Sequence, residues 1–189
     1  HSFFLKNQLT HRDHKAIIAT CKKAKLIWFS TPAHFTDVDY LEKFQPKIYK
    51  IGSDDLTNIP LIKYIAQKKK KIILSTGMSN LIDIKKAVKA IEEEGNKKID
   101  ILHCVSDYPT EIKNINLNVI KTLKKNFNYK IGLSDHTNND LTSILATTMG
   151  AEIIEKHIIP SYELKNWPDA EASLDVNDFG KMIFKLRNI

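Results

Sequence analysis

Two histidines are candidates for metal chemistry. His136 and His157 each follow a short apolar run, and Glu155 lies two positions before the second of them. Neutral imidazole is a common ligand for Mn²⁺, Fe²⁺ or Zn²⁺, and two imidazoles leave open positions for water and substrate oxygens. Asp135 and Glu155 are candidate acceptors that orient the rings. Residues two apart on a strand face the same side, so Lys156 should point away from Glu155 and His157. The alternative is that either imidazole only satisfies a buried hydrogen bond.

A second group of residues is suited to binding an anion. Lys50 and Ser53 end one apolar run, Ser75 ends the next, and Ser134 ends a later one. Together they could supply a cation, hydroxyls and main-chain N–H groups to one phosphate or carboxylate. In the segment STGM, Gly77 permits close backbone approach just before a predicted helix N-terminus. The alternative is an ordinary strand-to-helix turn, in which the hydroxyls cap the helix.

Six short apolar runs must position these residues. Each run is rich in Ile, Leu or aromatic side chains, and they cover 26–30, 47–53, 71–76, 98–104, 129–135 and 152–157. Such runs favour parallel strands that are covered on both faces. Segments with helical periodicity alternate with them, at 11–23, 37–44, 59–67, 80–94, 116–126, 138–148 and 176–187.

This alternation predicts an α/β fold, either a doubly wound sheet or a (β/α)₈ TIM barrel. A nucleotide-binding doubly wound sheet usually carries GxGxxG or GxxxxGK[ST] after an early strand, and neither motif occurs. We therefore expect residues 1–189 to form one incomplete (β/α)₈ barrel of about six units, with the first two missing. The active site of a barrel lies at the carboxyl ends of its strands, where the candidate residues are. His103 also ends a run, but its direction is not fixed by the sequence.

The composition excludes several classes of protein. The chain has 189 residues, of which 42% are hydrophobic and 27% charged, as in an ordinary globular domain. The net charge of +7 comes from scattered lysines without arginines and aromatics on one face, so we expect no nucleic-acid partner. No apolar stretch approaches the ~20 residues of a membrane span, and no signal peptide is recognisable, so we expect a cytoplasmic protein without membrane contact. Cys21 and Cys104 are too far apart in sequence to indicate a disulfide framework or a zinc–thiolate site.

Several motifs occur in the same order as in a known family. They are YKIGSDDLTN, ILSTGMS, LHCVSDYPT, IGLSDHT and IIEKHI, followed by PDAEASLD. From about Phe29 to Arg187 the chain resembles the sialic acid synthase family, the NeuB-type synthases of N-acylneuraminate and related nonulosonic acids. The resemblance implies a transferase that condenses phosphoenolpyruvate with an N-acetylhexosamine, such as N-acetylmannosamine, and releases phosphate. It also implies a homodimer and a small antifreeze-protein-like domain after the barrel, which we expect to be absent here.

The resemblance further implies roles for individual residues. The positions that hold the phosphate and carboxylate of phosphoenolpyruvate correspond to Lys50, Ser53, Ser75 and Ser134. The imidazoles that bind the divalent metal, Mn²⁺ or Mg²⁺, correspond to His136 and His157, and the acid beside them to Glu155, a candidate base. Positions near the sugar and the enolpyruvyl group correspond to Tyr108 and Asp169. Ser106 stands where some relatives have Asn, and Trp167 replaces the commoner Gly before Pro-Asp, which affects the expected sugar specificity.

Two other functions stay open at this point. Another phosphoenolpyruvate-dependent sugar-acid synthase, acting on a phosphorylated sugar, would need additional arginines, whereas the chain has only Arg12 and Arg187. This shortage favours a non-phosphorylated sugar. The chain could also be a non-catalytic part of a barrel that serves as an interaction subunit, because the expected missing strands carry sugar- and metal-proximal groups in the family.

Overall fold

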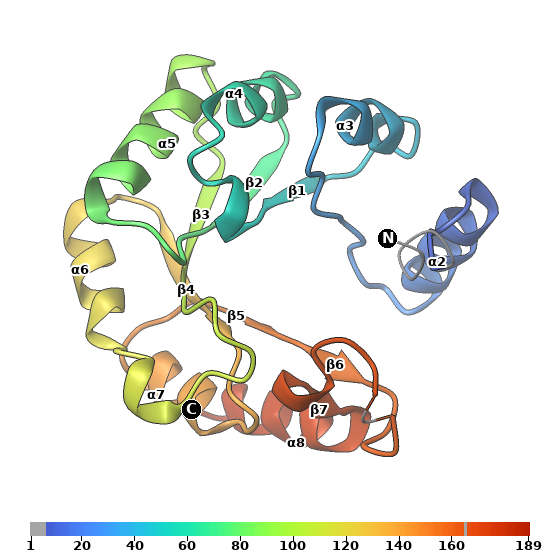
Figure 1. The fold of residues 1–189 in the computed structure, drawn as a ribbon, viewed down its shortest axis with the longest axis vertical. Coiled ribbons are helices and arrows are strands. Elements are labelled where there is room, and N and C mark those ends of the chain that lie inside the picture. Colours follow the sequence, from blue (N-terminus) through green and yellow to red (C-terminus); the bar gives the residue numbers. More distant parts are fainter. Residues whose placement is uncertain (1–6, 165) are drawn as a thin grey trace.

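The computed structural model describes residues 7–164 and 166–189. In this part of the chain, the main sheet has five parallel strands in the order β1-β2-β3-β4-β5. The sheet is curved and helices cover its convex side, so that the described residues form an open half-barrel (Figure 1). The strands are β1 (Ile48–Ile51), β2 (Lys71–Ser75), β3 (Ile99–Cys104), β4 (Lys130–Asp135) and β5 (Ile153–Lys156).

The helices lie close to their predicted positions. They are α2 (His11–Lys23), α3 (Phe35–Glu42), α4 (Ile59–Gln67), α5 (Leu81–Glu93), α6 (Asn118–Asn126), α7 (Leu141–Thr148) and α8 (Val176–Leu186). Local sequence sets their starts: Asn80 and Asp83 form a capping box on α5, and Asp175 caps α8. None of the helices in the described ranges is long and apolar enough to cross a membrane.

Alternation along the strands separates the core from the concave face. Side chains such as Ile72, Leu74 and Ile101 are fully buried and belong to the hydrophobic cluster under the outer helices. Their neighbours point the other way, and at the carboxyl end of β2 this inward residue is Ser75. Gly132 allows β4 to pack closely against β5, because a Cβ there would lie 2.3 Å from the carbonyl oxygen of Ile153. The core thus fixes which strand-end residues face inward.

The prediction of a strand at 26–30 is largely wrong. Only Ser30 pairs, in an isolated bridge to Tyr49, where its carbonyl accepts a hydrogen bond from the Lys50 N–H. Leu26 and Ile27 are 65% and 60% exposed. An apolar run becomes a strand only where an adjacent strand exchanges backbone hydrogen bonds with it, and among the described residues of this run only Ser30 forms a bridge to another strand. Two short strands that were not predicted, β6 (Ile158–Ile159) and β7 (Leu174–Asp175), form a separate parallel pair.

Candidate functional site

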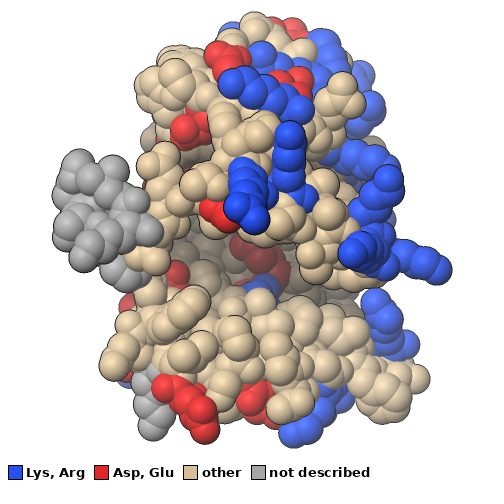
Figure 2. Space-filling view, turned by 90° about the vertical axis from the view of Figure 1, so that its right-hand side faces the viewer, with Lys and Arg blue, Asp and Glu red and all other residues tan. Residues whose placement is uncertain are grey.

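A cavity of about 550 Å³ opens on the concave side, at the carboxyl ends of the five strands. In Figure 2 this hollow lies between two lobes, with acidic and basic groups visible in its depth. Asp169 is outside the lining, although its Oδ2 lies 3.8 Å from Nδ1 of His157. The other predicted site residues all line the cavity, namely Lys50, Ser53, Ser75, Ser106, Tyr108, Ser134, His136, Glu155 and His157.

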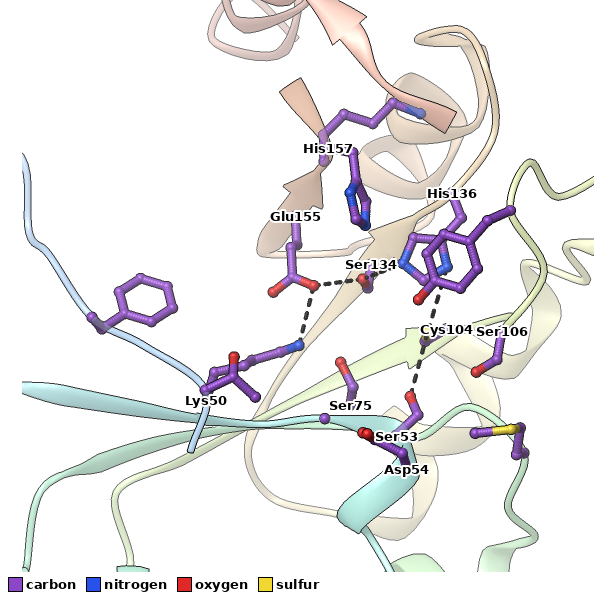
Figure 3. Close-up of a pocket in the computed structure, with 16 residues that line it drawn as sticks. Lys50, Ser53, Asp54, Ser75, Cys104, Ser106, Ser134, His136, Glu155 and His157 are labelled. Carbon is purple, nitrogen blue, oxygen red and sulfur yellow. Dashed lines mark hydrogen bonds and ion pairs between the residues drawn. The ribbon is translucent and has the colours of Figure 1, made fainter. Parts of the chain in front are cut away.

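Four of these residues form one polar chain across the cavity (Figure 3). Lys50 Nζ donates to Glu155 Oε1 at 3.1 Å, and Ser134 Oγ donates to the same oxygen at 2.6 Å. Ser134 Oγ also lies 3.2 Å from Nε2 of His136. Lys50 is on β1 and Glu155 on β5, so the lysine stem crosses the concave face between the outermost strands of the main sheet. A buried ammonium and its carboxylate thus face the position where a ligand would enter.

Hydrogen bonds define the protonation of His136. Its Nδ1 lies 2.7 Å from the carbonyl oxygen of Val105, which can only accept, so Nδ1 carries the hydrogen. Burial lowers the pKa of His136 from its ordinary value, and the ring is therefore neutral at pH 7. Ser134 has a single hydroxyl hydrogen, which the closer Glu155 oxygen accepts. The Nε2 atom of His136 consequently keeps a lone pair.

Tyr108 and His157 form the wall beside His136. The Tyr108 ring stacks on His136 with centroids 4.0 Å apart, and the rings of His136 and His157 have centroids 5.3 Å apart at 70°. Burial, with nearby Cys104 and acidic groups, raises the pKa of Tyr108 to about 12. The phenol therefore remains a neutral hydroxyl at physiological pH. The two imidazoles are neighbours although they come from different strand ends, as the sequence predicted.

The imidazole pair fits a divalent cation. The bond from Nδ1 of His136 to a backbone carbonyl is the arrangement that commonly orients metal-binding histidines, and it leaves Nε2 available. In the described residues, no group of three or more His, Cys, Asp or Glu side chains is arranged for a metal. His136 and His157 could supply two imidazole ligands to such a cation, with the other positions open to water or substrate oxygens. Imidazole ligands favour Mn²⁺ over Mg²⁺, which prefers oxygen.

An unpartnered hydroxyl lies in the same cavity. Ser75 is 2% exposed, and its Oγ has no hydrogen-bond partner among the described residues. A buried polar group without a partner costs about 1–3 kcal/mol, so this hydroxyl indicates a ligand position. Nearby, the Gly77 N–H donates to Ser53 Oγ at 3.0 Å, and a Cβ at Gly77 would lie 2.4 Å from Ser106 Oγ. Glycine thus keeps the space between the two serines open.

Two strand-end residues face the helices instead of the cavity. The expectation that Asp135 orients the imidazoles is wrong, because its carboxylate bonds to Lys156 and to hydroxyls of α7. Burial opposes its charge, but Lys156 and these donors outweigh burial and lower the pKa of Asp135. His103 likewise faces outward, with Nε2 2.6 Å from the Ile115 carbonyl. Alternation explains both, because each lies between inward-facing neighbours.

Glu155 also differs from its expected contact. It was expected to orient an imidazole ring, whereas its Oε1 accepts from Lys50 and Ser134. The sequence interpretation also missed residues that line the cavity, including Phe29, Thr31, Asp54, Met78 and Cys104. Cys104 could have been found, because it ends a strand and alternates with the outward-facing His103. Its Sγ accepts from Ser53 Oγ at 3.5 Å.

Comparison with known proteins identifies the family. Residues 1–189, the whole chain, match the model of the NeuB family. The chain belongs to the NeuB family. It is 38% identical to the N,N'-diacetyllegionaminic acid synthase of Campylobacter jejuni over 186 residues, which cover 97% of this chain and 55% of that protein. It is 35% identical to the pseudaminic acid synthase of the same organism over 174 residues, covering 92% and 50% of the two proteins.

The NeuB-family fold is shared with solved structures. A crystal structure of the N-acetylneuraminic acid (sialic acid) synthetase of Leptospira borgpetersenii, in complex with citrate, superposes with a TM-score of 0.92 at 30% identity, covering 95% of this chain and 62% of that one. The predicted family and the incomplete-barrel fold class are thus confirmed. The chain spans about half the length of the curated relatives it matches. The domain limits, the homodimer and the cytoplasmic location stay predictions.

Proposed function

We propose that this NeuB-family chain forms the phosphoenolpyruvate- and metal-binding side of a nonulosonic acid synthase. The enzyme condenses phosphoenolpyruvate with an N-acetylhexosamine, resembling N-acetylmannosamine, to give a sialic acid or a related nonulosonic acid and phosphate. The observation that carries this proposal is the polar chain of Lys50, Glu155, Ser134 and His136 beside the unpartnered Ser75 hydroxyl. The names of two similar proteins, synthases of diacetyllegionaminic and pseudaminic acid, support the substrate class.

The anionic substrate is assigned to the part of the cavity around Lys50. The Lys50 ammonium is buried, and an anion that binds there replaces or joins Glu155 as its partner. The hydroxyls of Ser53, Ser75 and Ser134 line the same cavity and can donate to phosphate or carboxylate oxygens. Ser75 gains the partner that it otherwise lacks. Phosphoenolpyruvate would therefore give the Lys50 ammonium a further or alternative anionic partner and the Ser75 hydroxyl its first partner.

The sugar is assigned to the part of the cavity near Tyr108. The Tyr108 hydroxyl and Ser106 line the cavity there, and Asp169 lies against His157. These groups can exchange hydrogen bonds with sugar hydroxyl and acetamido groups. Within the described residues, no arginine lines the cavity.

The residues suit the proposed condensation. C3 of phosphoenolpyruvate forms the new bond to the aldehyde carbon of the open-chain sugar, while water adds at C2 and phosphate leaves from C2. Glu155 is placed to accept the proton of that water, and Lys50 and the serine hydroxyls hold the departing phosphate. A divalent metal on His136 and His157, when bound, supplies Lewis acidity at the aldehyde oxygen. Binding both reactants between the same strand ends would hold the reacting carbons close together.

A phosphate-release assay with product mass spectrometry tests the proposal. The purified protein is incubated with phosphoenolpyruvate, Mn²⁺ and a panel of N-acetylated hexosamines. We expect phosphate release only when a sugar is present, together with a product heavier than the sugar by one pyruvate unit. His136→Ala should abolish the metal-dependent rate, whereas His11→Ala, on α2 and outside the cavity lining, should keep it. Sugar-independent phosphate release, or an unchanged rate in His136→Ala, would contradict the assignment.

A further inference from the structure

A buried ion pair lies directly behind the site. Lys156 Nζ is 3.3 Å from Asp135 Oδ1, and both side chains are 0% exposed. Asp135 and Lys156 are also register partners in the β4–β5 ladder. The Asp135 carboxylate further accepts hydrogen bonds from the Thr137 N–H at 2.9 Å, Thr137 Oγ1 at 2.8 Å, Thr142 Oγ1 at 2.7 Å and Ser143 Oγ at 2.6 Å. Lys156 also donates to the Thr137 carbonyl. The network joins β4, β5 and the start of α7.

The pair alternates with the groups assigned to the ligands. Asp135 lies between Ser134 and His136, and Lys156 lies between Glu155 and its neighbour His157. Successive residues of a strand point to opposite faces, so the direction of the pair determines the direction of the residues on either side. Burying two charges is costly compared with apolar packing, and such pairs are best explained where they specify geometry. The ion pair therefore fixes the helix-facing side of β4 and β5 at their carboxyl ends, and the cavity residues lie on the opposite side of the same ends.

We propose that the Asp135–Lys156 pair is a positioning device that directs Ser134 of β4, Glu155 of β5 and the imidazoles that directly follow these strands into the cavity. The carboxylate reaches α7 through Thr142 and Ser143, so the helix limits how far the end of β4 can rotate. Lys156 belongs to the lining of the cavity, but its side chain is 0% exposed and its ammonium bonds to Asp135 and Thr137, so neither charged group reaches the ligand in this role. The identity of the ligands that these groups bind rests on the proposed function, whereas the orientation of the groups does not.

A second buried carboxylate provides the matched control. Asp100 on β3 has 5% of its side chain exposed and pairs with Lys71 at the start of β2, away from the carboxyl ends. Asp135→Asn and Asp100→Asn each remove one buried charge from an ion pair, so both should lower the melting temperature. Only Asp135→Asn should also change ligand binding and the orientation of His136. The measurements are the dissociation constants of Mn²⁺ and phosphoenolpyruvate by calorimetry, and the ¹⁵N-histidine NMR signals of His136.

We expect Asp135→Asn to raise the Mn²⁺ dissociation constant by about 10-fold or more, in the range typical of groups that orient metal ligands. It should also shift the His136 Nδ1–H signal, which reports the bond to Val105. Asp100→Asn should leave both unchanged. If the wild-type protein binds neither Mn²⁺ nor phosphoenolpyruvate, the proposed function fails, while the NMR comparison still tests the positioning.

A milder variant keeps the inference testable if Asp135→Asn does not fold. Ser143→Ala removes one donor to Asp135 from α7 and leaves the charges in place. It should shift the His136 signal in the same direction by a smaller amount. A folded Asp135→Asn with wild-type His136 signals and dissociation constants would overturn the inference. So would an unchanged His136 signal in Ser143→Ala, because the pair would then contribute stability alone.

Discussion

Replacing Lys50 by Met removes the buried ammonium and keeps the aliphatic stem across the concave face. Glu155 then retains Ser134 as a donor, and the cavity gains an uncompensated negative charge. Because 34% of the Glu155 side chain is exposed, water can solvate the carboxylate, and the free energy of unfolding should fall by only about 1 kcal/mol or less. Binding of an anion should respond far more than stability.

The expected loss of affinity follows from the hydrogen bond that an anion would accept from the Lys50 ammonium. A hydrogen bond involving a charged partner contributes about 1.5–3 kcal/mol, and 1.4 kcal/mol corresponds to a factor of 10 in affinity. The dissociation constant of phosphoenolpyruvate should therefore rise by about 10-fold to 150-fold in Lys50→Met. Without the ammonium, the Glu155 carboxylate also repels the anion, so the rise in the dissociation constant should lie toward the upper end of this range.

Isothermal calorimetry on the purified protein measures this change directly. Lys63→Met is the control, because Lys63 pairs with Glu93 at 3.0 Å on the outer surface, far from the cavity lining. Circular dichroism melting curves show whether each variant is folded. A dissociation constant in folded Lys50→Met within about threefold of the wild-type value would refute the reasoning, because the ammonium would then not contact the anion.

Three further predictions concern other parts of the molecule. Gly77→Ala should weaken phosphoenolpyruvate binding with little change in melting temperature, because its Cβ would lie 2.9 Å from Ser53 Oγ inside the cavity; calorimetry would show no change if this space is unused. Gly132→Ala should destabilise the fold by about 3 kcal/mol or more, measured by urea unfolding, because the clash with the Ile153 carbonyl cannot be relieved by a rotamer. Burial lowers the pKa values of His103 and His136 from 6.5, so the unfolded chain binds more protons below pH 6.5 and stability should fall as the pH decreases. Melting curves of His103→Gln should show a weaker loss between pH 6.5 and 5 than those of the wild type.

Elements with a strong local signal were predictable from the sequence. The helix at 59–67 was predicted at its observed bounds, since Asn58 caps it and its apolar residues repeat with helical spacing. The strand predicted at 26–30 was largely wrong, because a strand needs a partner and sequence hydrophobicity does not supply one. The strands β6 and β7 contain two residues each, and their pairing depends on chain folding between distant positions. Local periodicity carries no information about such contacts.

In the site, too, local sequence position was predictable and contacts between distant residues were not. Strand-end positions identified Lys50, Ser134 and Glu155 as candidate site residues, and the structure brings them together. The sequence did not predict that Lys50 and Glu155 pair, because the contact joins residues on separate outer strands. Asp135 was expected to orient the imidazoles, although strict alternation with Ser134 directs it to the helices. Side-chain type alone was thus a weaker guide than strand position.

The Lys50–Glu155 contact also has a consequence for how the half-barrel holds together. It joins residues 105 positions apart and links β1 to β5, the two edge strands of the main sheet, across its concave face. A ligand bound at this contact would tie the first and last strands of the sheet at once, and its binding free energy would add to the free energy of unfolding of everything between them. Hydrogen-exchange protection by such a ligand should therefore extend to the central strand β3, whose amides it does not touch.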